Sequence, residues 1–227
     1  MTHHFALRTF RLTAASLLLA MLGACSSWLP TPSSPPRFYA FEQAKIALPP
    51  ASASAAATTL IINPPHAAPG FDSRRIIYVR EPYLLEYYAH SEWVDTPARM
   101  LAPLMVGAIE NTSAFRAVIL TPSPARGELR LYSEIVRLQH EVGNLPGRVR
   151  FTLRAYLVDN ATRQVVASRE FEQTVTVESE TPYASVIAAN LAVRGVLVEL
   201  ANFCQEIGKN RRLTVALGKA PLGAAEQ

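Results

Sequence analysis

Residues 148–177 read RVRFTLRAYLVDNATRQVVASREFEQTVTV, and this stretch decides the fold of the chain. In its first part every second side chain is apolar: Val149, Phe151, Leu153, Ala155 and Leu157. Such alternation is typical of a β-strand with one buried face and one face in water. The turn-forming run at 159–163 then predicts a hairpin, with residues 164–177 as the returning strand.

The hairpin register follows from the position of its turn. A hairpin centred on Ala161 places Arg150 opposite Glu172 on the outer face, which is a favourable cross-strand pair. An exposed pair of this kind contributes at most about 1 kcal/mol, so it sets the register more than the stability. Glu170 and Glu172 share this face, and we interpret them as part of a solvated, arginine-rich surface rather than as an acid/base pair.

The preceding strand, residues 128–142, changes its phase. Leu129, Leu131 and Ile135 share one parity, whereas Val136, Leu138 and Val142 share the other. A β-bulge near Ile135-Val136 reconciles the two halves. The three strands together predict a long antiparallel meander.

Two helices are expected to pack on this sheet. The first, at about 96–112, begins with Thr96 as N-cap and Pro97 as the first helical residue. Its buried side is predicted to consist of Met100, Leu101, Leu104, Met105, Ala108 and Ile109. The second, 182–207, carries an apolar stripe with alternating spacings of three and four residues: Val186, Ala189, Val193, Val196, Leu200, Phe203 and Ile207. This stripe predicts packing on the domain's own sheet, with a helix of another subunit as the alternative.

The remaining segments complete an α+β fold with a mostly antiparallel sheet. Short strands are predicted at 37–41, 60–62, 74–80, 83–88 and 118–120. The Pro/Ala-rich stretch 49–57 is expected to form a surface loop, and 208–227 a flexible tail. The folded domain is therefore predicted to span residues 37–207.

The amino-terminal segment has the order of a secretory signal. Arg8 and Arg11 precede an uncharged, mostly apolar run at 12–22, and Leu22-Gly23-Ala24-Cys25 follows. The run would rise only about 16 Å as a helix, against a hydrocarbon core of roughly 30 Å. The sequence LGAC resembles the bacterial lipobox, whose cysteine is lipidated and becomes the mature N-terminus. The alternative is an ordinary signal peptide with an incidental cysteine.

The lipobox resemblance implies a signal peptide at 1–24 and a lipidated, Pro/Ser-rich tether at 25–36. Bacterial lipoproteins carry three acyl chains (palmitate among them), and since one chain alone anchors only marginally, three should hold the protein on its membrane. Ser26 follows the cysteine where inner-membrane retention would favour aspartate. We therefore expect an outer-membrane location, with the domain facing the periplasm.

Composition excludes several classes of protein. Removing residues 1–24 takes away two arginines and no acidic residue, so the formal charge falls from +4 to +2, which does not suggest a nucleic-acid-binding protein. If Cys25 carries lipid, Cys204 has no intrachain partner, and its apolar surroundings predict a buried, inert thiol. His66, His90 and His140 lie in different segments without metal-ligand spacing. No catalytic residues, cofactor or metal site are predicted, and the protein is not expected to be an enzyme.

An aromatic run, Tyr83, Tyr87, Tyr88 and Trp93, is the unusual local feature. These rings either fill the core beneath the first helix or form contact area for a partner or an acyl chain. In a strand at 83–88, Tyr83, Leu85 and Tyr87 would share one face. Tyr83, Tyr87 and Trp93 are the candidate partner or lipid contacts.

Five segments in order resemble the ABC-type transport auxiliary lipoprotein family, the PqiC/YmbA-like components of MCE lipid-transport systems. They are RFYAF (37–41), FDSRRIIYV (71–79), LEYYAHSEWVDTPARML (85–101), VVASREFEQTVTV (165–177) and AANLAVRGVLVELANF (188–203). Trp93 and Pro97 match the family's Trp before a Pro-containing helix, and Ser168 and Phe171 match its Ser-x-x-Phe strand. The long, Ala-rich stretch 49–57 departs from the family.

The resemblance implies a non-enzymatic lipoprotein that docks a periplasmic MCE protein at the outer membrane. That protein is coupled to an inner-membrane permease and ATPase, which supplies the energy. Some members of the family assemble into rings, so self-association is expected. The alternative is a lipoprotein that carries lipid or another ligand itself, enclosed between the sheet and the helices, and a cargo-free structural lipoprotein is a weaker possibility.

Overall fold

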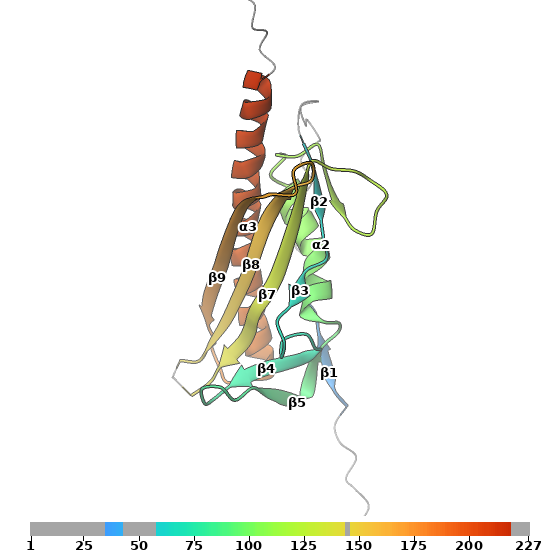
Figure 1. The fold of residues 1–227 in the computed structure, drawn as a ribbon. Helices are drawn as coiled ribbons and strands as arrows, with labels where there is room; N and C mark the ends of the chain where they lie inside the picture. Colours follow the sequence, from blue (N-terminus) through green and yellow to red (C-terminus); the bar gives the residue numbers. More distant parts are fainter. Residues whose placement is uncertain (1–34, 43–57, 144–145, 219–227) are drawn as a thin grey trace, which may run out of the picture. The chain divides into compact units, whose positions relative to one another are not determined.

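The computed structural model describes residues 35–42, 58–143 and 146–218. Within these ranges it contains a nine-stranded sheet and two long helices, which confirms the α+β class (Figure 1). Cys25, the predicted signal peptide and the predicted loop at 49–57 lie outside the described residues. The strands are β1 (Arg37–Tyr39), β2 (Thr59–Ile62), β3 (His66–Ala67), β4 (Arg75–Val79), β5 (Glu86–Trp93), β6 (Ala117–Leu120), β7 (Leu129–Glu141), β8 (Arg148–Asp159) and β9 (Val165–Thr176). The helices are α2 (Pro97–Glu110) and α3 (Pro182–Gly218).

Strands β7, β8 and β9 form the predicted antiparallel meander. The register of β7 against β8 shifts between Ile135 and Arg137, which confirms the predicted bulge. The predicted register of β8 against β9 was wrong, because Arg150 lies opposite Thr174 and Glu172 opposite Thr152. An irregularity near the turn, beyond the Leu157 pair, moves the register of the whole hairpin.

The other edge of β7 pairs with three short strands in succession. β2, β3 and β4 all run parallel to β7, while β6 adds to β2, β5 adds antiparallel to β4, and β1 runs parallel to β5. The sheet is therefore mixed, with its long pairs antiparallel and most of its short pairs parallel. All four residues of β2 are buried, as is typical of a parallel strand covered on both faces.

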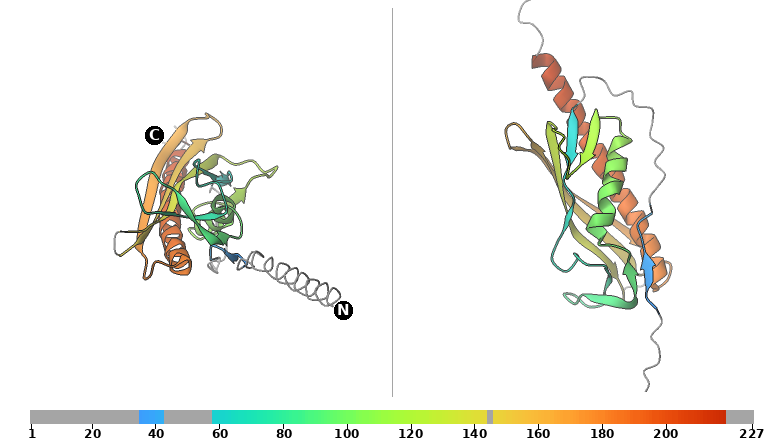
Figure 2. Two further views of the ribbon diagram at one scale, coloured as in Figure 1. Left: turned by 90° about the horizontal axis from the view of Figure 1, so that it is seen from below. Right: turned by 90° about the vertical axis from the view of Figure 1, so that its right-hand side faces the viewer.

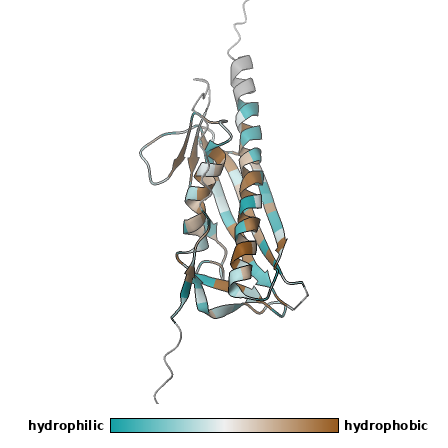
Figure 3. Cartoon of the chain, turned by 180° about the vertical axis from the view of Figure 1, so that it is seen from behind, coloured by the Kyte–Doolittle hydropathy of each residue, from teal (hydrophilic) through white to brown (hydrophobic). Residues whose placement is uncertain are grey.

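Both helices lie side by side against one face of the sheet (Figure 2). The alternating residues of β8 point to them and are fully or almost fully buried. The predicted stripe of α3 packs on this sheet, and brown and white residues alternate with teal along the helix seen from behind (Figure 3). Among the described residues α3 alone is long and apolar enough to span a membrane, but 56% of that window is buried inside the fold, as in a core helix.

Two predicted boundaries and one predicted capping bond need correction. β5 begins at Glu86 instead of Tyr83, and α3 continues to Gly218, eleven residues beyond the predicted end at Ile207 and into the predicted tail. A Cβ at Gly208 would lie 3.1 Å from the Phe115 ring, so this glycine serves close packing instead of ending the helix. Thr96 is the N-cap residue of α2, but its side chain makes no capping bond.

Candidate functional site

The three candidate contact residues lie in different settings. Tyr83 is fully exposed in the turn between β4 and β5, where the Leu84 amide donates to the Glu81 carbonyl over 3.2 Å. Tyr83 has a φ of 73°, so this is a turn with Pro82 at the second position and a left-handed third residue. The predicted strand face shared by Tyr83, Leu85 and Tyr87 was therefore wrong, because Pro82 turns the chain before β5 begins.

Tyr87 and Trp93 differ in accessibility, although both belong to β5. Tyr87 is half exposed, with the Arg75 guanidinium 3.9 Å above its ring. Trp93 is only 2% exposed and packs on Phe41 with 5.0 Å between the ring centroids. Trp93 is thus a core residue and not a surface contact, while Tyr83 and Tyr87 remain accessible.

Polar side chains of β5, β7 and the loop before α3 lie close together around His140, which is buried, whereas Tyr88 is half-buried and Glu180 exposed. The Tyr88 hydroxyl and Nδ1 of His140 share a hydrogen bond of 2.8 Å, and His140 Nε2 lies 3.6 Å from the Glu180 carboxylate. Burial lowers the pKa of His140, although the charge of Glu180 acts in the opposite direction. Burial, followed by the Glu180 charge, raises the pKa of Tyr88 to about 12. Near neutral pH the imidazole is therefore neutral; it bonds Tyr88, while its Nε2 has no hydrogen-bond partner among the described residues.

This cluster makes stability depend on pH. Because the folded-state pKa of His140 lies below the unfolded value of about 6.5, the unfolded chain binds the extra proton first. The contribution of His140 is therefore complete above pH of about 6.5 and is lost as pH falls through and below it. We expect the unfolding free energy to fall more steeply between pH of about 7.5 and 5.5 in the wild type than in His140→Gln. Chemical denaturation at each pH measures the unfolding free energy. His90→Gln, at an exposed histidine, is the control. An equal dependence of the unfolding free energy on pH in the wild type and in His140→Gln would contradict the prediction.

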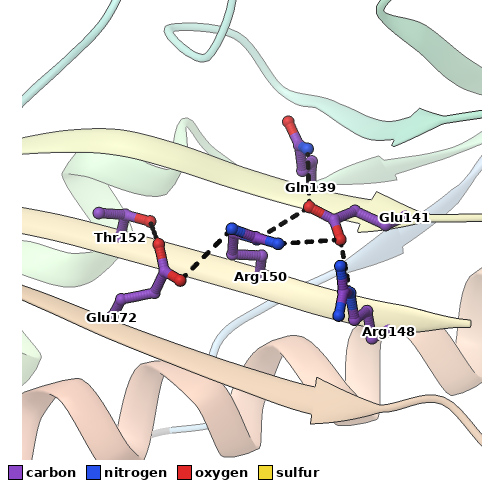
Figure 4. A network of polar contacts seen from close by, with 6 residues as sticks. All are labelled: Gln139, Glu141, Arg148, Arg150, Thr152 and Glu172. Atoms are coloured by element: carbon purple, nitrogen blue, oxygen red, sulfur yellow. Dashed lines mark hydrogen bonds and ion pairs between the residues drawn. The ribbon is translucent and has the colours of Figure 1, made fainter. Parts of the chain in front are cut away.

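The outer face of the meander carries a network of ion pairs (Figure 4). Glu141 accepts from Arg148 over 2.6 Å and pairs with Arg150 at 2.8 Å. Burial works against ionisation of Glu141, but the hydrogen bonds from both arginines outweigh it and lower its pKa. Arg150 also reaches Glu172 diagonally, at 3.4 Å, despite the shifted register. Glu170 pairs with Arg154 at 2.9 Å, so both carboxylates belong to a solvated, charge-paired face.

A mostly apolar groove lies between α2 and α3. Its volume is about 410 Å³. Its apolar lining comes from both helices: Leu104, Ala108, Val193, Leu197, Val198 and Ala201. Glu42 and Arg194, which also line the groove, form an ion pair at 2.8 Å. The side chain of Val198 is 56% exposed. The predicted stripe did not include Val198, which in the sequence is only a single apolar residue outside that stripe.

Besides Thr112 and the Glu42–Arg194 pair, four carboxamides contribute polar groups to this groove. Asn190 accepts from the Glu42 amide and donates to the Val186 carbonyl, and Gln205 donates to the Thr112 carbonyl over 3.1 Å. The amide oxygen of Asn111 is buried without a hydrogen-bond partner in the described structure. Asn202 lines the groove and is exposed. A groove with apolar walls and amide groups still free to form hydrogen bonds can bind a peptide segment through both its side chains and its backbone.

Metal or thiol chemistry finds no support in the described residues. No group of three or more His, Cys, Asp or Glu side chains there is placed to hold a metal ion. Cys204 is completely buried, and burial raises its pKa to about 12, which fits the predicted inert thiol.

Comparison with known proteins gives one family and several similar folds. A family model described as the ABC-type transport auxiliary lipoprotein component matches residues 39–201. A crystal structure of protein XCC0632 from Xanthomonas campestris, of family DUF330, is 24% identical with a TM-score of 0.63 over 80% of this chain and 95% of that one. An uncharacterised protein of known structure is 12% identical, with a TM-score of 0.58 over 77% and 99% of the chains. At these identities the two structures show the fold alone. No relative was found among proteins of curated function.

Proposed function

Because this chain belongs to the ABC-type transport auxiliary lipoprotein family, we propose that it docks the periplasmic MCE component of an intermembrane lipid-transport system at the outer membrane. In this proposal lipidated Cys25 holds the domain on the membrane, facing the periplasm. An inner-membrane permease and ATPase supply the energy, and the chain itself binds without catalysing a reaction. The coarser part is established by the family: the protein is a membrane-anchored auxiliary component of ABC-type transport.

The family match over residues 39–201 is the observation that carries this proposal. It extends from the last residue of β1 to the part of α3 that lines the groove, so the sheet and both helices belong to the family domain. The described residues offer binding surfaces and charge-paired faces, which suits a docking role.

The groove between α2 and α3 is our candidate for the MCE contact. Exposed Val198 and the apolar walls would bury apolar side chains of the partner, while exposed Asn202 would bond its backbone. A few well-packed residues usually carry most of the energy of such an interface. Tyr83 and Tyr87 are accessible as additional contacts.

Val198→Glu should disrupt this contact without unfolding the domain. A carboxylate in the apolar groove would be desolvated by the partner, so we expect at least about a tenfold loss of affinity, equivalent to 1.4 kcal/mol. Co-purification of the MCE protein from gently solubilised membranes, quantified by mass spectrometry, measures the effect.

The matched control is Val165→Glu, because Val165 has a similar exposure of 58% but lies on β9, outside the groove. Undiminished recovery of the MCE protein with Val198→Glu would reject the groove as the contact. If the wild type comes out of native membranes alone under gentle conditions, the docking function itself is wrong.

The alternative function, a lipid carrier, would use the same groove. The space between sheet and helices is filled by core side chains, whereas about 410 Å³ in the groove is in the range of small-ligand pockets. Phospholipid retained by the purified wild type and lost from Val198→Glu, with no MCE protein bound, would favour the carrier.

A further inference from the structure

The turn between β4 and β5 exposes three large side chains in succession. Tyr83 is fully exposed, Leu84 is 49% exposed and Leu85 is 44% exposed. Tyr83 also adopts the positive φ of 73° that usually favours glycine or asparagine. A water-exposed turn would gain nothing from an aromatic residue there, and such a local conflict points to a contact made by this turn.

Behind this turn lies a second hollow, on the outer face of β7. Its volume is about 530 Å³, and Leu85 forms part of its wall. The apolar part of the lining includes Phe71, Val79, Val136 and Val142, and the cationic part consists of Arg80, Arg137 and Arg150. Gln139 and the carboxylate of Glu141 also line the hollow. Apolar and cationic groups therefore face the same space.

Within the described part of the chain, the charges around this hollow leave one cation without a partner. Arg150 is paired with Glu141, and Arg80 lies 3.9 Å from Glu86. Arg137 makes no side-chain hydrogen bond or ion pair with residues in the described ranges, and it is only partly exposed. Glu81 in the turn and Asp72 beside Phe71 are exposed acidic residues, and Glu141 in the lining is neutralised by Arg148 and Arg150. A cationic side chain with apolar neighbours favours the binding of an anionic amphiphile.

β1, the first described strand after Cys25, pairs with β5, which begins just after the β4–β5 turn. β1 runs parallel to β5 with Arg37 opposite Ser91, five residues and thus about 17 Å from Glu86, where β5 begins after the turn. Residues 25–36 can span at most about 40 Å. An anchor at Cys25 would therefore hold this end of the domain within reach of the bilayer surface.

We propose that the β4–β5 turn contacts the bilayer and that Arg137 and Arg80 bind the phosphate of an anionic phospholipid headgroup. Tyr83, Leu84 and Leu85 lie in the interfacial region, where aromatic and apolar side chains are favoured. This inference rests on the lipid anchoring in the proposed function. It adds a contact of the protein itself to that of the acyl chains, which would fix the orientation of the domain on its membrane.

The test uses full-length lipidated protein in nanodiscs of phosphatidylcholine, alone or mixed with phosphatidylglycerol. Amide hydrogen exchange is measured for peptides covering residues 80–88 and 136–142, with the loop 121–127 at the other end of the sheet as internal reference (Figure 1). We expect both test peptides to exchange more slowly with phosphatidylglycerol present. Leu84→Ser should remove the protection of 80–88 in both lipids.

Arg137→Gln should reduce the effect of phosphatidylglycerol about fivefold, the value expected for one arginine at an anionic surface, and the exposed Arg126→Gln should not. Unchanged exchange in both nanodiscs would overturn the inference, as would an effect that glycerol phosphate in solution reproduces without anionic lipid. Protection that appears only when the MCE protein is added would make the turn a protein interface and reject the lipid contact. Intact mass reports the acylation of Cys25 separately, so failure of the anchor is distinguishable from failure of this contact.

Discussion

Replacing Cys25 with serine should abolish acylation and outer-membrane attachment completely. Serine lacks the thiol to which the lipid is joined in the lipobox reaction. Each methylene buried in the bilayer contributes about 0.8 kcal/mol, so three acyl chains account for essentially all of the membrane affinity. Without the modified cysteine the signal peptide should also stay uncut, and the precursor should leave the outer-membrane fraction.

Intact mass spectrometry and membrane fractionation measure both effects. The wild type should begin at Cys25 and carry the mass of the acyl chains, whereas Cys25→Ser should keep residues 1–24 and carry none. Cys204→Ala is the matched control, because that thiol is completely buried and has no role in anchoring. An acylated Cys25→Ser protein, or a wild type trimmed elsewhere, would refute the anchor.

Trp93→Ala should lower the free energy of unfolding by about 3–5 kcal/mol, the range measured for large aromatic residues in protein cores. Its side chain is 2% exposed, so the substitution leaves a cavity beside Phe41. The contact between the two rings adds about 0.5–1.5 kcal/mol to the burial of their surface. Chemical denaturation followed by far-UV circular dichroism is the suitable measurement, since the substitution removes a fluorophore.

Tyr83→Ala is the counterpart on the surface, and it should change the unfolding free energy by no more than about 0.5 kcal/mol. If Trp93→Ala loses partner or lipid binding, the cause would therefore be unfolding of the domain. If Tyr83→Ala loses the same binding, the cause would be loss of a direct contact made by Tyr83. A loss below about 1 kcal/mol for Trp93→Ala would show that the core around Phe41 adapts to the cavity or that Trp93 is not packed as described.

The C-terminal half of the fold could be predicted because its signals are local. The alternation along β8 and the phase change near Ile135 each concern neighbouring residues, and the structure confirms both the strand and the bulge. The stripe on α3 predicted its buried side for the same reason. The predicted end of α3 before Gly208 was wrong, because this glycine packs against Phe115, which is distant in sequence.

The candidate site could be predicted only in part. Cys204 was placed correctly in the core, because an apolar helical stripe is a burial signal. The aromatic run did not separate accessible Tyr83 and Tyr87 from buried Trp93, since aromatic residues suit both cores and contact surfaces. Arg137 and Val198 carried no signal, because each gains its meaning from side chains of other elements.

Patterns within single segments were enough to predict the lipobox resemblance, the meander with its bulge and the two amphipathic helices. Contacts between distant segments were needed to show that β2, β3 and β4 share one edge of β7, that α2 and α3 enclose a groove, and that the β4–β5 turn lines a hollow together with Arg137. The physical reason is that hydrophobic periodicity fixes which face of an element is buried, but burial has no direction and leaves open which neighbour covers that face.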